Sequence, residues 1–162
     1  ELRRLDAGDG ERIPLLGEVF DEIGGATGIN VELKGPRTAE PVAKFIAERV
    51  ANGWPLDRLL VSSFDHRMLE IFRAARPDVP LGALISEPAK DASFAAELGA
   101  TSVHPALDFV DRRFVDDAHE RGLAVYVYTV NEPSDIARMR ALGVDGVFSD
   151  FPDRVIDGQS RM

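Results

Sequence analysis

Short apolar runs rich in β-branched residues alternate with segments of helical period along most of the chain. Six such runs recur: "INVEL", "LLVSSF", "LGALIS", "SVHPAL", "AVYVYTV" and "DGVFSD". Strands that are separated by helices lie parallel, with right-handed crossovers. The alternation therefore predicts six successive βα units that form a parallel sheet. An apolar segment at residues 15–23 predicts one further helix before the first strand.

The segments between these runs carry apolar residues on one helical face. In one of them Val42, Phe45, Ile46 and Val50 fall at i, i+3, i+4 and i+8. Thr38 stands where the N-cap of that helix is expected. The same periodicity recurs over residues 114–118 and 136–142. Glycines that favour the left-handed conformation at helix C-termini follow three of the helical segments, at Gly99, Gly122 and Gly143.

The βα pattern indicates a single domain over residues 1–162, because no composition break or low-complexity linker interrupts it. It leaves two architectures open. One is an open, doubly wound sheet, and the other is part of an eight-stranded (β/α) barrel. A complete barrel typically takes about 250 residues, so six units are too few for one. The pattern by itself slightly favours the open sheet.

The composition is globular and acidic. Hydrophobic residues make up 44% of the chain, and 19 basic against 28 acidic residues give a net charge of −9. This balance argues against broad contact with nucleic acid or with an anionic membrane. No apolar run approaches the roughly 18 residues of a membrane helix, so we expect no membrane insertion. No signal-peptide pattern stands at the start, which reads like the middle of a protein, and we expect a cytoplasmic location.

The segment "INVELKG" has a polar and an apolar face. Since successive side chains of a strand point to opposite faces, the apolar side chains from Ile29 to Leu33 share one face. Asn30, Glu32 and Lys34 share the other. Lysine is scarce in this chain, with only Lys34, Lys44 and Lys90. The polar face fits either the solvated side of an edge strand or a functional site.

Five motifs occur in a characteristic order: "GERIPLLGEVF", "INVELKG", "VSSFD", "VYTVNE" and "GVDGVFSDFPD". Together they resemble the glycerophosphodiester phosphodiesterase family, from about Glu1 to Asp153. The resemblance implies a TIM-barrel fold, of which this chain would form strands three to eight. It also implies hydrolysis of small-molecule glycerophosphodiesters to glycerol 3-phosphate and an alcohol, with Mg²⁺ or Ca²⁺ as the metal.

The resemblance also implies roles for four residues. Glu32 matches a metal-binding carboxylate of the family, and Lys34 matches the lysine that contacts the phosphate. Phe64 matches a phenylalanine near the substrate, and Tyr128 stands where the family usually has tryptophan. The first two roles are chemically reasonable, because hard cations prefer carboxylate oxygens and a phosphodiester that gains negative charge attracts an ammonium group.

The acid–base histidines of the family do not occur in this chain. They stand in His-Arg-Gly and His-Asp motifs, whereas His66, His104 and His119 stand in neither. The resemblance therefore implies the C-terminal part of such an enzyme, inactive by itself. The alternative is a non-catalytic α/β binding or regulatory domain. A receiver-like module would need an acidic cluster after its first strand, which the sequence lacks.

Asp65, Asn131 and His104 are predicted to have structural roles. We expect Asp65 and Asn131 to cap the helices that follow them, and His104 to be an interior histidine whose polar atoms are satisfied. An incomplete barrel has two open sheet edges, and unpaired edges tend to pair with another chain. We therefore also expect self-association through these edges.

Overall fold

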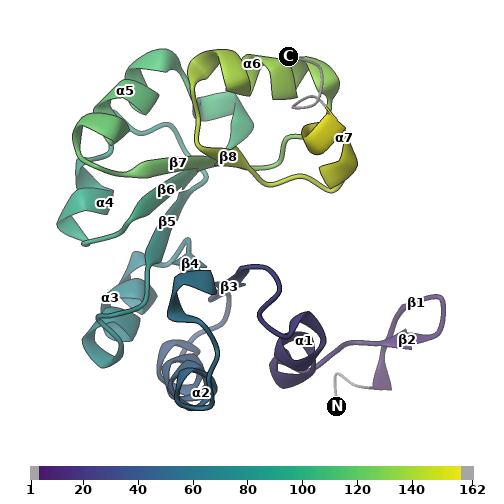
Figure 1. The fold of residues 1–162 in the computed structure, drawn as a ribbon. Coiled ribbons are helices and arrows are strands. Elements are labelled where there is room, and N and C mark those ends of the chain that lie inside the picture. Colours follow the sequence, from purple (N-terminus) through teal and green to yellow (C-terminus); the bar gives the residue numbers. More distant parts are fainter. Residues whose placement is uncertain (1–3, 158–162) are drawn as a thin grey trace.

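The computed structural model of the protein describes residues 4–157, and its main sheet has six parallel strands in sequential order. The strands are β3 (Ile29–Glu32), β4 (Leu59–Ser63), β5 (Leu81–Ile85), β6 (Ser102–Pro105), β7 (Ala124–Val127) and β8 (Gly146–Val147). They curl into an arc (Figure 1). The prediction of six parallel strands from an incomplete barrel is confirmed. The open doubly wound sheet is wrong, because the strand order shows no reversal.

A helix follows each strand of the arc. These helices are α2 (Ala39–Ala51), α3 (His66–Ala75), α4 (Ser93–Glu97), α5 (Arg112–Glu120), α6 (Pro133–Leu142) and α7 (Pro152–Asp157). Helix α1 (Leu16–Ile23) precedes the first strand, as expected, and short 3₁₀ turns occupy Leu56–Arg58 (η2) and Leu107–Phe109 (η3). None of the helices in residues 4–157 combines the length and apolar character needed to cross a membrane.

A small antiparallel hairpin at the N-terminal end was not predicted. It pairs β1 (Asp6–Gly8) with β2 (Glu11–Arg12) and extends away from the sheet (Figure 1). Its strands are exposed and too short to give a periodic pattern. The carboxylate of Asp6 accepts hydrogen bonds from the backbone amides of Gly8 and Gly10, at 2.8 and 3.2 Å. Local turn chemistry rather than burial thus holds this hairpin.

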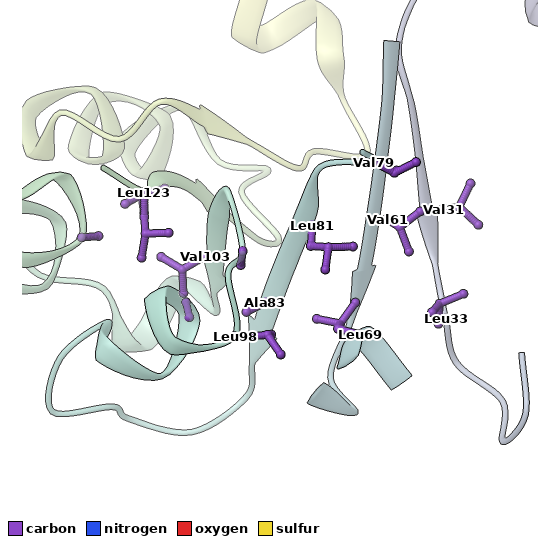
Figure 2. Packing of buried hydrophobic residues seen from close by; sticks show 14 of the residues in the cluster. Val31, Leu33, Val61, Leu69, Val79, Leu81, Ala83, Leu98, Val103 and Leu123 are labelled. Carbon is purple, nitrogen blue, oxygen red and sulfur yellow. The ribbon is translucent and has the colours of Figure 1, made fainter. Parts of the chain in front are cut away.

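The main core lies between the sheet and the helices. Alternate strand residues point outward to the helices, and most of them are apolar and buried, as Val31, Val61 and Leu81 illustrate. Figure 2 shows these side chains on neighbouring strands together with Leu69 of α3. Burial of each such side chain stabilises the fold by roughly 1.5–3 kcal/mol. The alternation fixes which residues remain on the opposite, concave face.

Most of the predicted helix ends are observed. Gly99, Gly122 and Gly143 have φ angles of 69°, 75° and 74°, the left-handed conformation expected of them. The side chain of Asp65 caps α3 by accepting a hydrogen bond from the amide of Arg67 at 3.1 Å. Thr38 occupies the N-cap position of α2, but no side-chain capping bond forms there.

The predicted cap at Asn131 is wrong, because Glu132 is the N-cap residue of α6. Asn131 instead connects the segments that follow β7 and β8. Its Nδ2 donates to Asp150 at 2.8 Å, and its Oδ1 accepts from the Asp150 amide at 2.9 Å. Both strands have ended here, so the side-chain amide provides hydrogen bonds that the sheet ladder no longer makes.

Candidate active site

A pocket of about 350 Å³ lies on the concave face near the C-terminal ends of the strands. Sites in TIM barrels form at this end, built from the loops that follow the strands. The pocket is lined by Asn30, Glu32, Lys34, Phe64, Leu84, Tyr128, Thr129 and Phe148. The four residues selected from the sequence, Glu32, Lys34, Phe64 and Tyr128, therefore all line the same pocket, at or just beyond the C-terminal ends of β3, β4 and β7.

Glu32 and Lys34 form the charged side of this pocket. Lys34 Nζ lies 3.4 Å from Glu32 Oε2, and the side chains are 76% and 26% exposed, respectively. The second oxygen, Glu32 Oε1, is buried and has no hydrogen-bond partner in the part of the chain that the structure describes. A buried carboxylate oxygen without a partner is costly, so this atom is suited to accept a ligand. Lys34 extends into solvent, where it can meet an anion.

Phe64 and Tyr128 form the apolar side. Their rings meet edge to face, with centroids 5.6 Å apart and an interplanar angle of 89°. The Tyr128 hydroxyl donates a hydrogen bond of 2.7 Å to the carbonyl of Ile85. Burial, and then the negative charge of Glu32, raise the pKa of the Tyr128 phenol above its ordinary value. The phenol is therefore neutral near neutral pH, and its proton is held by the backbone.

His104 lies inside the arc but does not line the pocket. Its Nε2 shares a hydrogen bond of 2.8 Å with Ser102 Oγ, and its Nδ1 is buried without a partner among residues 4–157. The prediction that His104 is buried is thus confirmed, whereas the prediction that both ring nitrogens have hydrogen-bond partners is wrong. Burial lowers the pKa of the imidazole to about 4, so the ring is neutral at neutral pH.

The other two histidines have structural contacts. His66 Nε2 lies 2.9 Å from the carbonyl oxygen of Leu84, and its ring stacks on Phe94. His119 lies on α5 and contacts Asp145 at 2.8 Å. Neither residue lines the pocket. The described pocket therefore contains no histidine that could act as a general acid or base.

The pocket provides only part of the ligand set that a divalent metal ion requires. No group of three or more His, Cys, Asp or Glu side chains that could hold a metal ion occurs within residues 4–157. Glu32 fits the role of one ligand, because it offers a buried oxygen without a partner. Ca²⁺ takes six to eight oxygen ligands, and Mg²⁺ requires octahedral coordination, so a single carboxylate is too few to hold either ion tightly.

A larger hollow, of about 770 Å³, lies at the opposite end of the sheet. Its walls include Thr27, Leu59 and Thr101 near the N-terminal ends of the strands, and Phe148 lines both this hollow and the smaller pocket. The N-terminal end of a (β/α) barrel serves stability rather than chemistry. The smaller pocket is therefore the candidate active site despite the greater size of this hollow.

Sequence reasoning missed several inward-facing residues. Leu84 and Phe148 line the pocket, and Ser62 and Ser102 are buried on the same face of the sheet. The two-residue alternation of β5 could have placed Leu84, because Leu81 and Ala83 point outward. Phe148 follows a strand of only two residues, so alternation gave no useful signal there.

Comparison with known proteins identifies relatives over nearly the whole chain. The sequence model of the glycerophosphoryl diester phosphodiesterase family matches residues 1–154. The chain is 31% identical to a glycerophosphodiester phosphodiesterase from Caldanaerobacter subterraneus, covering 97% of this chain and 69% of that protein. It is also 31% identical to one from Bacillus altitudinis, covering 93% of this chain and 64% of that protein. The chain thus spans about two thirds of the length of these relatives.

Solved structures give the same result. A phosphodiesterase from Oleispira antarctica, in complex with the product sn-glycerol-3-phosphate, superimposes with a TM-score of 0.85 at 30% identity. The match covers 98% of this chain and 69% of that one. A crystal structure of a protein from Galdieria sulphuraria gives a TM-score of 0.86 at 27% identity, and the match covers 99% of this chain and 69% of that one.

Proposed function

Because this chain belongs to the glycerophosphoryl diester phosphodiesterase family, we propose that it contributes the phosphate-binding side of an enzyme that hydrolyses glycerophosphodiesters. The products are glycerol 3-phosphate and an alcohol. The observation that carries the proposal is the charged pair of Glu32 and Lys34 beside an aromatic wall in one pocket. The product complex of the Oleispira antarctica relative supports a small phosphorylated ligand.

Four residues of the pocket have a definite role in this proposal. The exposed ammonium group of Lys34 binds a phosphate oxygen and stabilises the negative charge that develops during the reaction. Glu32 holds that ammonium through Oε2 and offers Oε1 as one ligand to a divalent cation. A bound Mg²⁺ or Ca²⁺ would supply Lewis-acid stabilisation of the phosphate. The rings of Phe64 and Tyr128 exclude water beside the carbon chain of the substrate.

The general acid and base of the reaction come, in this proposal, from residues outside this chain. The described pocket lacks a histidine, and the family motifs that carry the acid–base histidines are absent from the sequence. General acid–base groups contribute typically 10²–10⁴-fold to a rate. We therefore propose that residues 1–162 act as the C-terminal part of a longer barrel and have no measurable phosphodiesterase activity alone.

The experiment measures glycerol 3-phosphate released from glycerophosphocholine in the presence of Mg²⁺ or Ca²⁺. It compares the 162-residue chain with a longer protein in which the two histidine motifs precede it. We expect turnover only from the longer protein, and only with added metal. Metal-dependent turnover by the 162-residue chain would overturn the proposal that the general acid and base lie outside it. An inactive longer protein would overturn the proposed activity.

The lack of a catalytic histidine in the pocket favours one alternative, a non-catalytic domain that binds a phosphorylated ligand through Lys34. In that case the longer protein binds glycerol 3-phosphate in a salt-sensitive manner and does not hydrolyse the diester. Isothermal titration with glycerol 3-phosphate, beside the turnover assay, separates the two functions.

Self-association forms part of the same proposal. Among the described strands β3 pairs only with β4, and β8 pairs only with β7. Each therefore has a free edge that can accept a strand from another chain. We expect the 162-residue chain to form dimers or larger species in sedimentation velocity runs at micromolar concentration. A monodisperse monomer with a cooperative thermal transition contradicts this expectation.

A further inference from the structure

Unsatisfied polar atoms gather on the concave face of the sheet. Five buried side-chain atoms in residues 4–157 have no hydrogen-bond partner. Three of them belong to inward-facing residues of the strands, namely Glu32 Oε1, Ser62 Oγ and His104 Nδ1. Ser62 and His104 are both 0% exposed. Native interiors rarely leave such groups unpaired, and an ordered water is a common explanation.

The strand register places Glu32 and Ser62 in one row across the sheet, and His104 pairs with Leu84 in the next layer. Glu32 pairs with Ser62, and Ser62 pairs with Gly82. Gly82 in turn pairs with Ser102. The row therefore runs from the candidate metal ligand on β3, through a buried hydroxyl on β4, to a glycine on β5 and a second hydroxyl on β6.

His104 fills the space that the glycine leaves in this row. A Cβ atom added to Gly82 would collide with the His104 imidazole, so the ring lies directly over this glycine. Its Nε2 is bonded to Ser102 at one end of the row. The rings of Tyr126 and Phe148 pack against the imidazole with centroid separations of 5.4 and 5.2 Å. The ring is thus fixed between neighbours, with its second nitrogen still unpaired.

We propose that a buried water bridges Ser62 Oγ and His104 Nδ1 to Glu32 Oε1, so that Ser62 and His104 are positioning residues for the Glu32 carboxylate. The effect of Ser62 and His104 on metal binding rests on the proposed function, in which Glu32 is a metal ligand. A carboxylate oxygen accepts more than one contact, so a bridging water leaves Glu32 Oε1 able to bind a cation. Hydrogen bonds to a ligating carboxylate fix its orientation, and their loss typically lowers metal affinity 10–100-fold.

The test is Ser62→Ala, because an unpaired hydroxyl and a water-bonded hydroxyl predict different results. Two quantities are measured in the longer protein: Mn²⁺ affinity by EPR titration, and the imidazole ¹⁵N resonances of His104 by NMR. If the water bridge exists, Ser62→Ala weakens Mn²⁺ binding about 10-fold and shifts the Nδ1 resonance. If the hydroxyl has no partner, the variant leaves both unchanged and unfolds at the same or a higher temperature, and the proposal is overturned.

Ser63→Ala is the matched control, since it removes a hydroxyl from the next residue of the same strand. Ser63 Oγ donates to the carbonyl of Leu33 at 2.7 Å, a contact outside the row. This variant should lower stability while the His104 resonances and the Mn²⁺ affinity stay unchanged. If it changes them as much as Ser62→Ala does, the effects are general and the positioning role is wrong.

Glu32→Gln separates this inference from the proposed function. If Glu32→Gln leaves Mn²⁺ affinity intact, the metal role of Glu32 fails, and the His104 resonance in Ser62→Ala alone decides whether the water site exists. If Glu32→Gln weakens Mn²⁺ binding but Ser62→Ala does not, the positioning role fails while the proposed function stands.

Discussion

The two faces of the sheet use the same strands for different purposes. On the outer face Val31, Val61 and Val103 pack under the helices, and the side chains are apolar and buried. Their neighbours in sequence on the inner face, Glu32, Ser62 and His104, are polar, and each has a buried atom without a partner. A shift of one residue along a strand thus changes a side chain from core packing to chemistry. The outer face stabilises the fold, and the inner face leaves hydrogen-bonding capacity for ligands.

The largest effect on stability should come from the outer side. Leu69 of α3 is fully buried against the sheet, so Leu69→Ala should lower the free energy of unfolding by about 2–5 kcal/mol. Mn²⁺ affinity measured under folding conditions should not change. Urea denaturation followed by circular dichroism provides the measurement. A loss of Mn²⁺ affinity in a folded Leu69→Ala protein would mean that the two faces are not independent.

The largest effect on activity should come from the inner face. Lys34→Ala should lower kcat about 100-fold, because it removes a charge that interacts with the phosphate in the transition state. The thermal midpoint should hardly move, since the side chain is 76% exposed. Lys44→Ala, on the exposed side of α2, removes the same charge away from the pocket and should leave kcat unchanged. Equal losses in both variants would indicate a general charge effect instead.

The inner face should also make stability depend on pH. Burial lowers the pKa of His104 in the folded state to about 4, whereas the unfolded value is near 6.5. Between these values the unfolded chain binds the proton and the folded chain does not, so stability falls as the pH drops. The expected loss from pH 7.5 to pH 5 is about 2 kcal/mol. Chemical denaturation of the wild type and of His104→Gln at both pH values tests this, and the variant should lose less stability than the wild type.

Sequence periodicity predicted the outer face better than the inner one. Alternation placed Val31 and Leu33 correctly, and the glycines at 99, 122 and 143 marked helix ends, because both signals depend on local geometry. Whether the sheet curls into a barrel or stays open depends on how the six strands assemble. Local periodicity carries no information about that assembly. Only the resemblance to a known family distinguished the barrel from the open sheet.

In the candidate site, too, local sequence predicted some contacts, whereas others depend on how distant segments assemble. Glu32 ends β3 and Lys34 follows two residues later in extended chain, so their proximity followed from the alternation alone. The contact of Phe64 with Tyr128 joins the segments that follow β4 and β7, and the row from Glu32 to Ser102 depends on strand register. Asn131 was assigned as a helix cap because local sequence cannot reveal a partner as distant as Asp150.

The smallest effects on stability and activity should come from the aromatic wall of the pocket. There the ring and the hydroxyl of Tyr128 can be tested separately. Tyr128→Phe keeps the ring against Phe64 and removes only the hydrogen bond to the Ile85 carbonyl. It should cost about 0.5–1.5 kcal/mol of stability, the usual net worth of such a bond, with little change in KM. Tyr128→Leu also removes the aromatic ring and should raise KM, while kcat falls less than in Lys34→Ala. Steady-state kinetics beside denaturation curves measure both parts. If Tyr128→Phe lowers kcat as strongly as Lys34→Ala, the hydroxyl takes part in the chemistry, and the assignment of Tyr128 to the apolar wall is wrong.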